Sequence, residues 1–154
     1  MKIKSTIVIA TCSRSENLKR CLTSLAGCSF SKGIVRVLVI ENGEKCDAET
    51  ICNESSLPVP LLYFYLHKPG QSSARKFSMT LIDSDDLVIF FDDDIRFSTS
   101  IIDAYICAAS TYGHSNFYGG PVLPEYETEP NRCLIDYYPF SIKGFSPFSR
   151  VTFT

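Results

Sequence analysis

Short apolar runs alternate with amphipathic segments along the first 123 residues of the chain. The runs are rich in β-branched residues and predict strands at 3–10, 34–40, 61–66, 87–91 and 116–123. Between them, apolar side chains recur every three or four residues, which predicts helices. The clearest helix places one set of apolar side chains on a single face: Leu18, Cys21, Leu22 and Leu25. The predicted order is strand then helix, four times over, followed by a last strand that contains two glycines.

Hydroxyl side chains stand near the predicted start of three helices, where they can cap free backbone N–H groups. Ser13 and Glu16 have the spacing of a capping box. One of the two serines at 72–73 is expected to cap the third helix, and a hydroxyl at 98–99 is expected to cap the fourth.

Nearly continuous apolar strands that alternate with helices are typical of a parallel sheet covered on both faces. We therefore expect an α/β fold: a Rossmann-like, mostly parallel sheet with helices on both faces, in a single domain over residues 1–123. Residues 124–154 contain four prolines and many aromatic side chains, without a helical or strand period. They are interpreted as a tail that forms a lid, an interface segment or a truncated acceptor region.

Composition narrows the functional classes. With 45% hydrophobic and 21% charged residues, the chain has the composition of a soluble globular protein. A net charge of −2 argues against a nucleic-acid partner, because phosphate binding needs a basic surface. The apolar run at 3–10 is too short to cross a bilayer. Seven cysteines, an odd number without CxxC spacing, favour a reducing cytoplasm.

The candidate chemistry lies at Asp92, Asp93 and Asp94, called the acidic run below, which directly follows a buried strand. In parallel sheets ligands bind beyond the carboxyl ends of the strands, where the loops at 11–14 and 41–43 are also expected. Adjacent carboxylates repel one another and need a counter-charge, which Mg²⁺ or Mn²⁺ supplies while taking further ligands from substrate phosphates. The alternative is that the acidic run only solvates a turn and caps the next helix. That alternative explains one aspartate better than three.

Five segments carry a family resemblance: IATCSRSENLKRCLTSL, VLVIENG, KPGQSSARKFSM, VIFFDDDIRF and YGGPVLPEY, in that order. Their order resembles that of family 2 glycosyltransferases, which are inverting enzymes with the GT-A nucleotide-diphospho-sugar transferase fold. The resemblance covers residues 1 to about 124 and implies that the chain holds the N-terminal, donor-binding part of such an enzyme.

The resemblance implies roles for four residues outside the acidic run. Thr11 and Arg14 would border the nucleobase. Glu41 stands where the family usually has an aspartate that reads the base edge, and its side chain is one methylene longer. Arg75 would contact the base or the phosphates, to which a guanidinium is suited. The alternative for Arg75 is an exposed helix residue whose stem is packed.

Within the acidic run, the resemblance implies that Asp94, together with Asp92, holds the metal and that Asp92 or Asp93 contacts the ribose. The metal would stabilise the nucleoside diphosphate as it leaves. The expected function is transfer of a sugar, with inversion, from a nucleoside-diphosphate sugar to a glycan or lipid-linked acceptor.

An inverting transfer also needs a general base close to the acceptor hydroxyl. The acids after residue 123 lie in a Pro-rich stretch that favours a solvated loop, so none is assigned: Glu125, Glu127, Glu129 and Asp136. A second hypothesis is therefore a non-catalytic or degenerate nucleotide-sugar-binding module that lacks the acceptor half. Separately, a second copy of the chain or a partner protein could supply that half. A dinucleotide-binding protein or a sugar-nucleotide pyrophosphorylase is disfavoured, because TCSRSE after the first strand contains no glycine.

Overall fold

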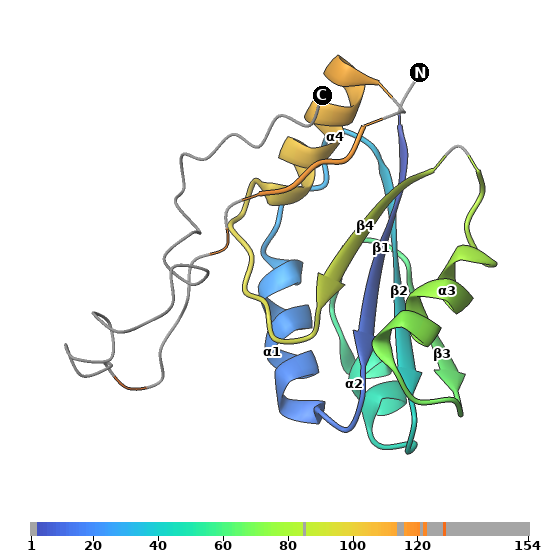
Figure 1. The fold of residues 1–154 in the computed structure, drawn as a ribbon. Helices are drawn as coiled ribbons and strands as arrows, with labels where there is room; N and C mark the ends of the chain where they lie inside the picture. The colour runs from blue at the N-terminus through green and yellow to red at the C-terminus, as the bar shows by residue number, and fades with distance from the viewer. Residues whose placement is uncertain (1–2, 85, 114–115, 121, 123–127, 129–154) are drawn as a thin grey trace, which may run out of the picture. The chain divides into compact units, whose positions relative to one another are not determined.

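Strands and helices alternate along the part of the chain that the structure describes (Figure 1). The computed structural model describes residues 3–84, 86–113, 116–120, 122 and 128. In chain order its elements are β1 Lys4–Thr11, α1 Ser15–Ala26, β2 Ile34–Asn42, α2 Ala48–Glu54, β3 Leu61–Leu66, α3 Gln71–Met79, β4 Leu87–Asp92 and α4 Ile101–Tyr112. The alternation predicted from the apolar pattern is confirmed through the fourth helix.

The four strands form one parallel sheet in the order β3-β2-β1-β4. Near its carboxyl end, β1 pairs through Ala10 with Ile40 of β2 and with Asp92 of β4. Because all the strands run in the same direction, their carboxyl ends meet at one edge of the sheet. Within the described residues, β3 and β4 are the edge strands. The expected α/β fold with a parallel sheet is confirmed.

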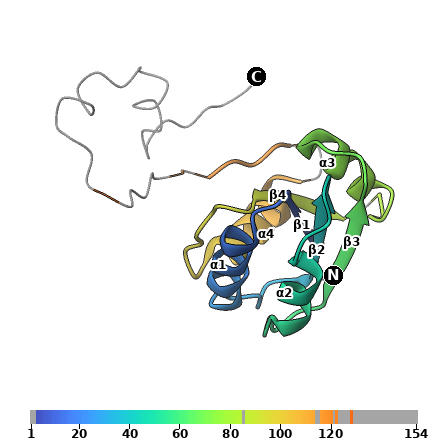
Figure 2. The ribbon, with the colours of Figure 1, turned by 90° about the horizontal axis from the view of Figure 1, so that it is seen from below.

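Helices cover both faces of this sheet, as the view along the strands in Figure 2 shows. The side chains of α1, α2 and α4 join one hydrophobic core, and those of α3 join the other. Successive strand residues point to opposite faces, so Ile7 and Ile9 enter the first core while Val8 and Ala10 enter the second. This two-sided burial explains why the strands are apolar at consecutive positions.

The helix starts differ from the predicted caps, and no side-chain cap hydrogen bond forms at α1, α3 or α4. Helix α1 begins at Ser15 and not at a capping box, because Ser13 adopts a left-handed backbone (φ 52°). The Ser13 hydroxyl instead accepts from the Cys46 thiol at 3.6 Å. Helix α3 follows Gly70 (φ 117°), a conformation that only glycine adopts without strain, and α4 follows Ser100. The predicted serine and threonine caps are therefore wrong.

A fifth strand at 116–123 is also wrong for the residues described there, since 116–120 and 122 adopt no strand. Two glycines weaken the β propensity of this run. The chain divides into two compact units, Met1–Asn116 and Phe117–Thr154. The second lies almost wholly outside the described residues, so the tail at 124–154 and its four acids stay predictions. In the described part of the chain, every helix is too short or too polar to cross a bilayer.

Candidate functional site

The carboxyl ends of β1, β2 and β4 bring together residues that are far apart in the sequence. Strand alternation then divides the acidic run between the two faces of the sheet. Asp92 continues the row of Val88 and Phe90 on the α3 face, whereas Asp93 continues the row of Ile89 and Phe91 on the α1 face. Asp92 and Asp93 therefore meet different partners.

Asp93 is the buried member of the acidic run, with 3% of its surface exposed. One of its carboxylate oxygens accepts a hydrogen bond from Thr11 Oγ1 at 2.8 Å, and the other accepts from Arg14 Nη1 at 3.3 Å. A buried carboxylate is tolerated only when it is paired and hydrogen-bonded. Thr11 and Arg14 thus fix Asp93, and Asp93 in turn anchors the turn after β4 that carries Asp94.

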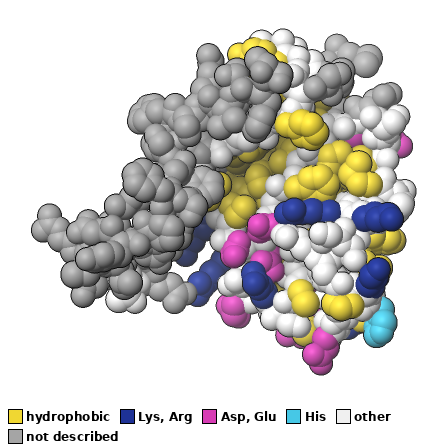
Figure 3. Space-filling model, in the orientation of Figure 1, with side chains coloured by type: hydrophobic (Ala, Val, Ile, Leu, Met, Phe, Trp, Pro, Cys, Tyr) yellow, Lys and Arg dark blue, Asp and Glu magenta, His cyan; other side chains and the backbone are white. Residues whose placement is uncertain are grey.

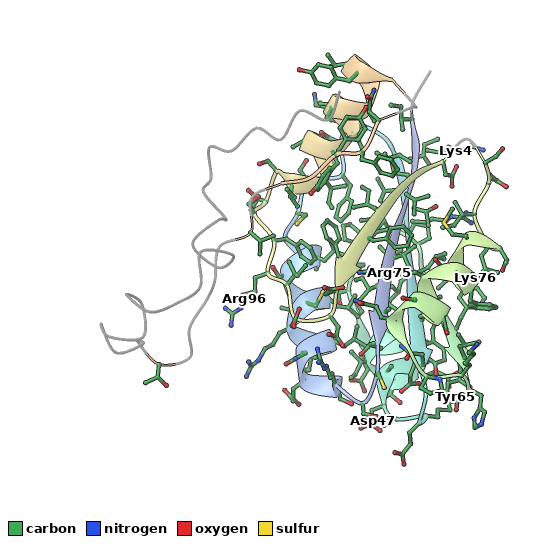
Figure 4. All side chains as sticks on the ribbon, viewed as in Figure 1. Lys4, Asp47, Tyr65, Arg75, Lys76 and Arg96 are labelled. Atoms are coloured by element: carbon green, nitrogen blue, oxygen red, sulfur yellow. The ribbon has the colours of Figure 1, made fainter. Side chains whose placement is uncertain are left out.

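Asp92 and Asp94 face solvent, with 47% and 55% of their side chains exposed. Asp92 Oδ1 accepts from Arg75 Nη2 at 2.8 Å and from the side-chain amide of Gln71, so both donors come from α3. Asp94 lies 3.6 Å from Arg14. Figure 4 shows Arg75 extending from α3 toward the end of β4, and Figure 3 shows acidic and basic side chains gathered side by side on this face.

Asn42, at the end of β2, links the end of β1 to the loop before α3. Its side chain is buried, and its Nδ2 donates to the Thr11 carbonyl at 2.8 Å. Its Oδ1 accepts from the backbone N–H of Gly70, just before α3, also at 2.8 Å. Sequence reasoning missed this residue, because residues 41–43 were interpreted only as a loop. A polar side chain at the end of an otherwise apolar strand was the available signal.

Glu41 lies in the same strand end but has different partners. It is 1% exposed, and its two oxygens accept from the Cys46 backbone N–H at 2.7 Å and from the Tyr63 hydroxyl at 2.5 Å. Burial raises the pKa of Tyr63, and the hydrogen bond to Glu41 and its negative charge raise it further. Both oxygens of Glu41 therefore serve internal hydrogen bonds. Its contact with a nucleobase stays a prediction.

The acidic run is suited to a divalent cation that is completed by a substrate. Among the described residues, no group of three or more His, Cys, Asp or Glu side chains could hold a metal by itself. The nearby Cys21 thiol is kept neutral, since burial first and the charges of the acidic run next raise its pKa to about 12. Mg²⁺ typically takes one or two carboxylates and completes its shell with phosphate oxygens and water. The exposed Asp92 and Asp94 fit that arrangement.

The sequence matches the family described as "Glycosyl transferase family 2" over residues 6–151. No match was found among curated proteins. Among solved structures, crystal structures of S. aureus TarS are similar at 17% identity over 71% of this chain: TarS (TM-score 0.62), TarS 1–349 (0.63) and TarS 1–349 in complex with UDP (0.62). This chain covers 20% of the first and 33% of the other two, so the likeness concerns the fold of one part of those proteins. Because the family match spans most of its length, the chain belongs to glycosyl transferase family 2.

Proposed function

We propose that this chain binds a nucleoside-diphosphate sugar and takes part in transferring its sugar, with inversion, to a glycan or lipid-linked acceptor. The observation that carries the proposal is the pair of exposed carboxylates, Asp92 and Asp94, held at the carboxyl edge of the sheet beside two arginines. Family membership supports glycosyl transfer, and one of the similar TarS structures is a complex with UDP. UDP is therefore the first nucleotide to test.

In this proposal, Asp94 and Asp92 would hold Mg²⁺ or Mn²⁺. When bound, the metal stabilises the negative charge that develops on the leaving nucleoside diphosphate. The burial of Asp93 supports Asp92, of the two candidates, as the ribose contact. The guanidinium groups of Arg14 and Arg75 are suited to phosphate oxygens, which planar N–H donors bind in pairs.

A second candidate function is nucleotide-sugar binding without catalysis. It is favoured by the ion pairs of Asp92 and Asp94 with Arg75 and Arg14, because carboxylates that stay paired would not hold a metal for the transfer step. In either case, the acceptor half would come from a second copy of the chain, from a partner protein or from residues outside the described ones. The general base stays unassigned, and a site of action in the cytoplasm is part of the proposal.

Calorimetric titration of UDP, GDP, dTDP and CDP, each with Mn²⁺ and again with chelator, tests the donor site. We expect one nucleotide to bind, and only with metal. Asp94→Asn should weaken this binding about tenfold or more through loss of a metal ligand. The matched control is Asp83→Asn, which removes the same charge from an exposed position before β4, at the opposite edge of the sheet.

The outcomes separate the claims. Absence of binding by all four nucleotides would reject the proposed function. Unchanged binding in Asp94→Asn would reject the metal assignment but leave the nucleotide site intact. Metal-dependent binding without transfer to any acceptor glycan would favour the non-catalytic candidate.

A further inference from the structure

The acidic run already has counter-charges supplied by its own chain. Arg75 Nη2 lies 2.8 Å from Asp92, and Arg14 Nη1 lies 3.6 Å from Asp94 and 3.3 Å from Asp93. Three carboxylates and two guanidinium groups leave a local net charge of minus one. Each exposed carboxylate that would hold a metal is therefore already occupied by an arginine.

We propose that Arg14 and Arg75 are exchangeable counter-ions of the acidic run. Without nucleotide, they neutralise Asp94 and Asp92. When a nucleoside diphosphate binds, the guanidinium groups turn to its phosphates and leave the carboxylates free for the metal. Nucleotide and metal then each strengthen the binding of the other, which is a reciprocal coupling. This inference rests on the proposed function, because it assumes that a nucleoside diphosphate enters this site.

Exposure supports exchange over a permanent structural pairing. The Arg75 and Arg14 side chains are 39% and 55% exposed and their partners Asp92 and Asp94 are 47% and 55% exposed, and ion pairs between groups this accessible to water are weak. Arg36 provides the contrast within the same chain. Its partner Asp86 is 4% exposed, and Arg36 is further fixed by the Thr6 hydroxyl. The pairs of Arg75 with Asp92 and of Arg14 with Asp94, in which both side chains are exposed, can be broken at lower cost than this one.

Other contacts hold the Arg75 guanidinium and the carboxylates of Asp92 and Asp93 in place when the ion pairs break. The Arg75 guanidinium lies over the Phe90 ring, 5.5 Å from its centroid, so the aromatic face still holds the cation near the site after it leaves Asp92. Gln71 donates to the same Asp92 oxygen and can keep that carboxylate oriented. On the other side, the hydrogen bond from Thr11 holds Asp93 when Arg14 turns away.

Electrostatics gives the direction of the coupling. Without nucleotide, a divalent cation meets an acidic run whose charge Arg14 and Arg75 have nearly neutralised. The cation must compete with these two arginines for the oxygen lone pairs of the carboxylates. A diphosphate removes the competitors and adds negative charge and ligands of its own. Removing one arginine should therefore help the metal bind alone and hinder the nucleotide.

The experiment measures Mn²⁺ binding to the full chain by the electron paramagnetic resonance signal of free Mn²⁺. Titrations are run without nucleotide and with UDP, GDP, dTDP or CDP, each corrected for the Mn²⁺ that the nucleotide binds in solution. Arg75→Gln is compared with Lys76→Gln, which removes the same charge from the adjacent, exposed position of α3. The control therefore reports the effect of net charge without the pairing to Asp92.

In Arg75→Gln we expect Mn²⁺ alone to bind about two- to fivefold more tightly than in the wild-type chain, the range set by an exposed ion pair. The nucleotide should bind more weakly, and its enhancement of Mn²⁺ binding should shrink. Lys76→Gln should change Mn²⁺ binding by less than about twofold. If Arg75→Gln binds Mn²⁺ alone no more tightly than Lys76→Gln, while the wild-type chain still binds nucleotide with metal, exchange is refuted and the proposed function stands. If the wild-type chain binds none of the four nucleotides, the proposed function fails instead.

Discussion

The hydrogen bond between Thr11 and Asp93 should contribute measurably to the stability of the fold. Both residues are 3% exposed, and the distance of 2.8 Å between Thr11 Oγ1 and Asp93 Oδ2 is that of a well-formed bond. Thr11→Val keeps the shape of the side chain but replaces the donor with a methyl group. The buried carboxylate would then keep only the longer contact of 3.3 Å with Arg14.

A hydrogen bond to a charged group contributes about 1.5–3 kcal/mol, and the added methyl group faces a carboxylate and recovers little of this. We therefore expect Thr11→Val to lower the free energy of unfolding by about 2 kcal/mol. The control is Thr11→Ser, which keeps the hydroxyl and loses one methyl group, at a cost of about 0.8 kcal/mol.

Urea unfolding followed by far-ultraviolet circular dichroism measures these differences. The chain has no tryptophan, so the eight tyrosines provide the second, fluorescence probe. The expected order of stability is wild type, then Thr11→Ser, then Thr11→Val. A Thr11→Val variant as stable as Thr11→Ser would refute the reasoning, because the hydroxyl would then contribute nothing to holding the buried carboxylate.

Three further predictions concern the rest of the sheet and its helices. Iodoacetamide at about pH 8 should label the exposed Cys107 in the native protein. Cys21 should be labelled only after unfolding, because burial raises the pKa of its thiol to about 12. Mass spectrometry measures the labelling, and equal labelling of the two cysteines in the native protein would contradict the prediction. Arg36→Met removes the cation beside Asp86, which is 4% exposed, and should lower the free energy of unfolding in urea by about 3 kcal/mol. A decrease of less than about 1 kcal/mol would exclude a structural role for the ion pair. Burial by itself would raise the pKa of Asp103, but the hydrogen bonds donated by the neighbouring serine hydroxyls and backbone N–H groups outweigh it and lower the pKa. The wild-type chain should therefore have a higher free energy of unfolding than Asp103→Asn at every pH above about 3.9, the pKa of aspartate in the unfolded chain. This difference should vanish as the pH falls through the lower pKa of Asp103 in the folded chain. A difference in urea unfolding that does not change with pH would contradict this linkage.

The strands were predictable because burial on both faces of the sheet requires apolar residues at consecutive positions. The apolar runs at 3–10 and 87–91 end within one residue of the observed β1 and β4. Helix caps were not predictable, because they depend on the backbone angles of single residues that distant contacts decide. Ser13 has a cap-forming side chain, but its positive φ and its contact with Cys46 remove it from the capping position.

The sequence predicted which residues of the candidate site lie close together, but not which hydrogen bonds they form. Parallel topology places the ends of β1 and β4 side by side, so the proximity of Thr11 to the acidic run follows from the order of elements. The hydrogen-bond partner of each oxygen does not follow from that order. The Glu41 side chain turns toward Tyr63, and Asn42 bonds to backbone atoms at the end of β1 and before α3, which a pattern of residue types does not encode.

The position of β4 at the margin of the sheet has a practical consequence for handling the protein. Among the described residues, β4 pairs only with β1, so its other row of backbone N–H and C=O groups has no strand partner there. The strand reads LVIFFD, without the lysines, prolines or bulges that discourage strands from adding to one another, and Phe90 is 40% exposed. Where this margin stays unpaired, it favours strand addition between molecules and therefore aggregation.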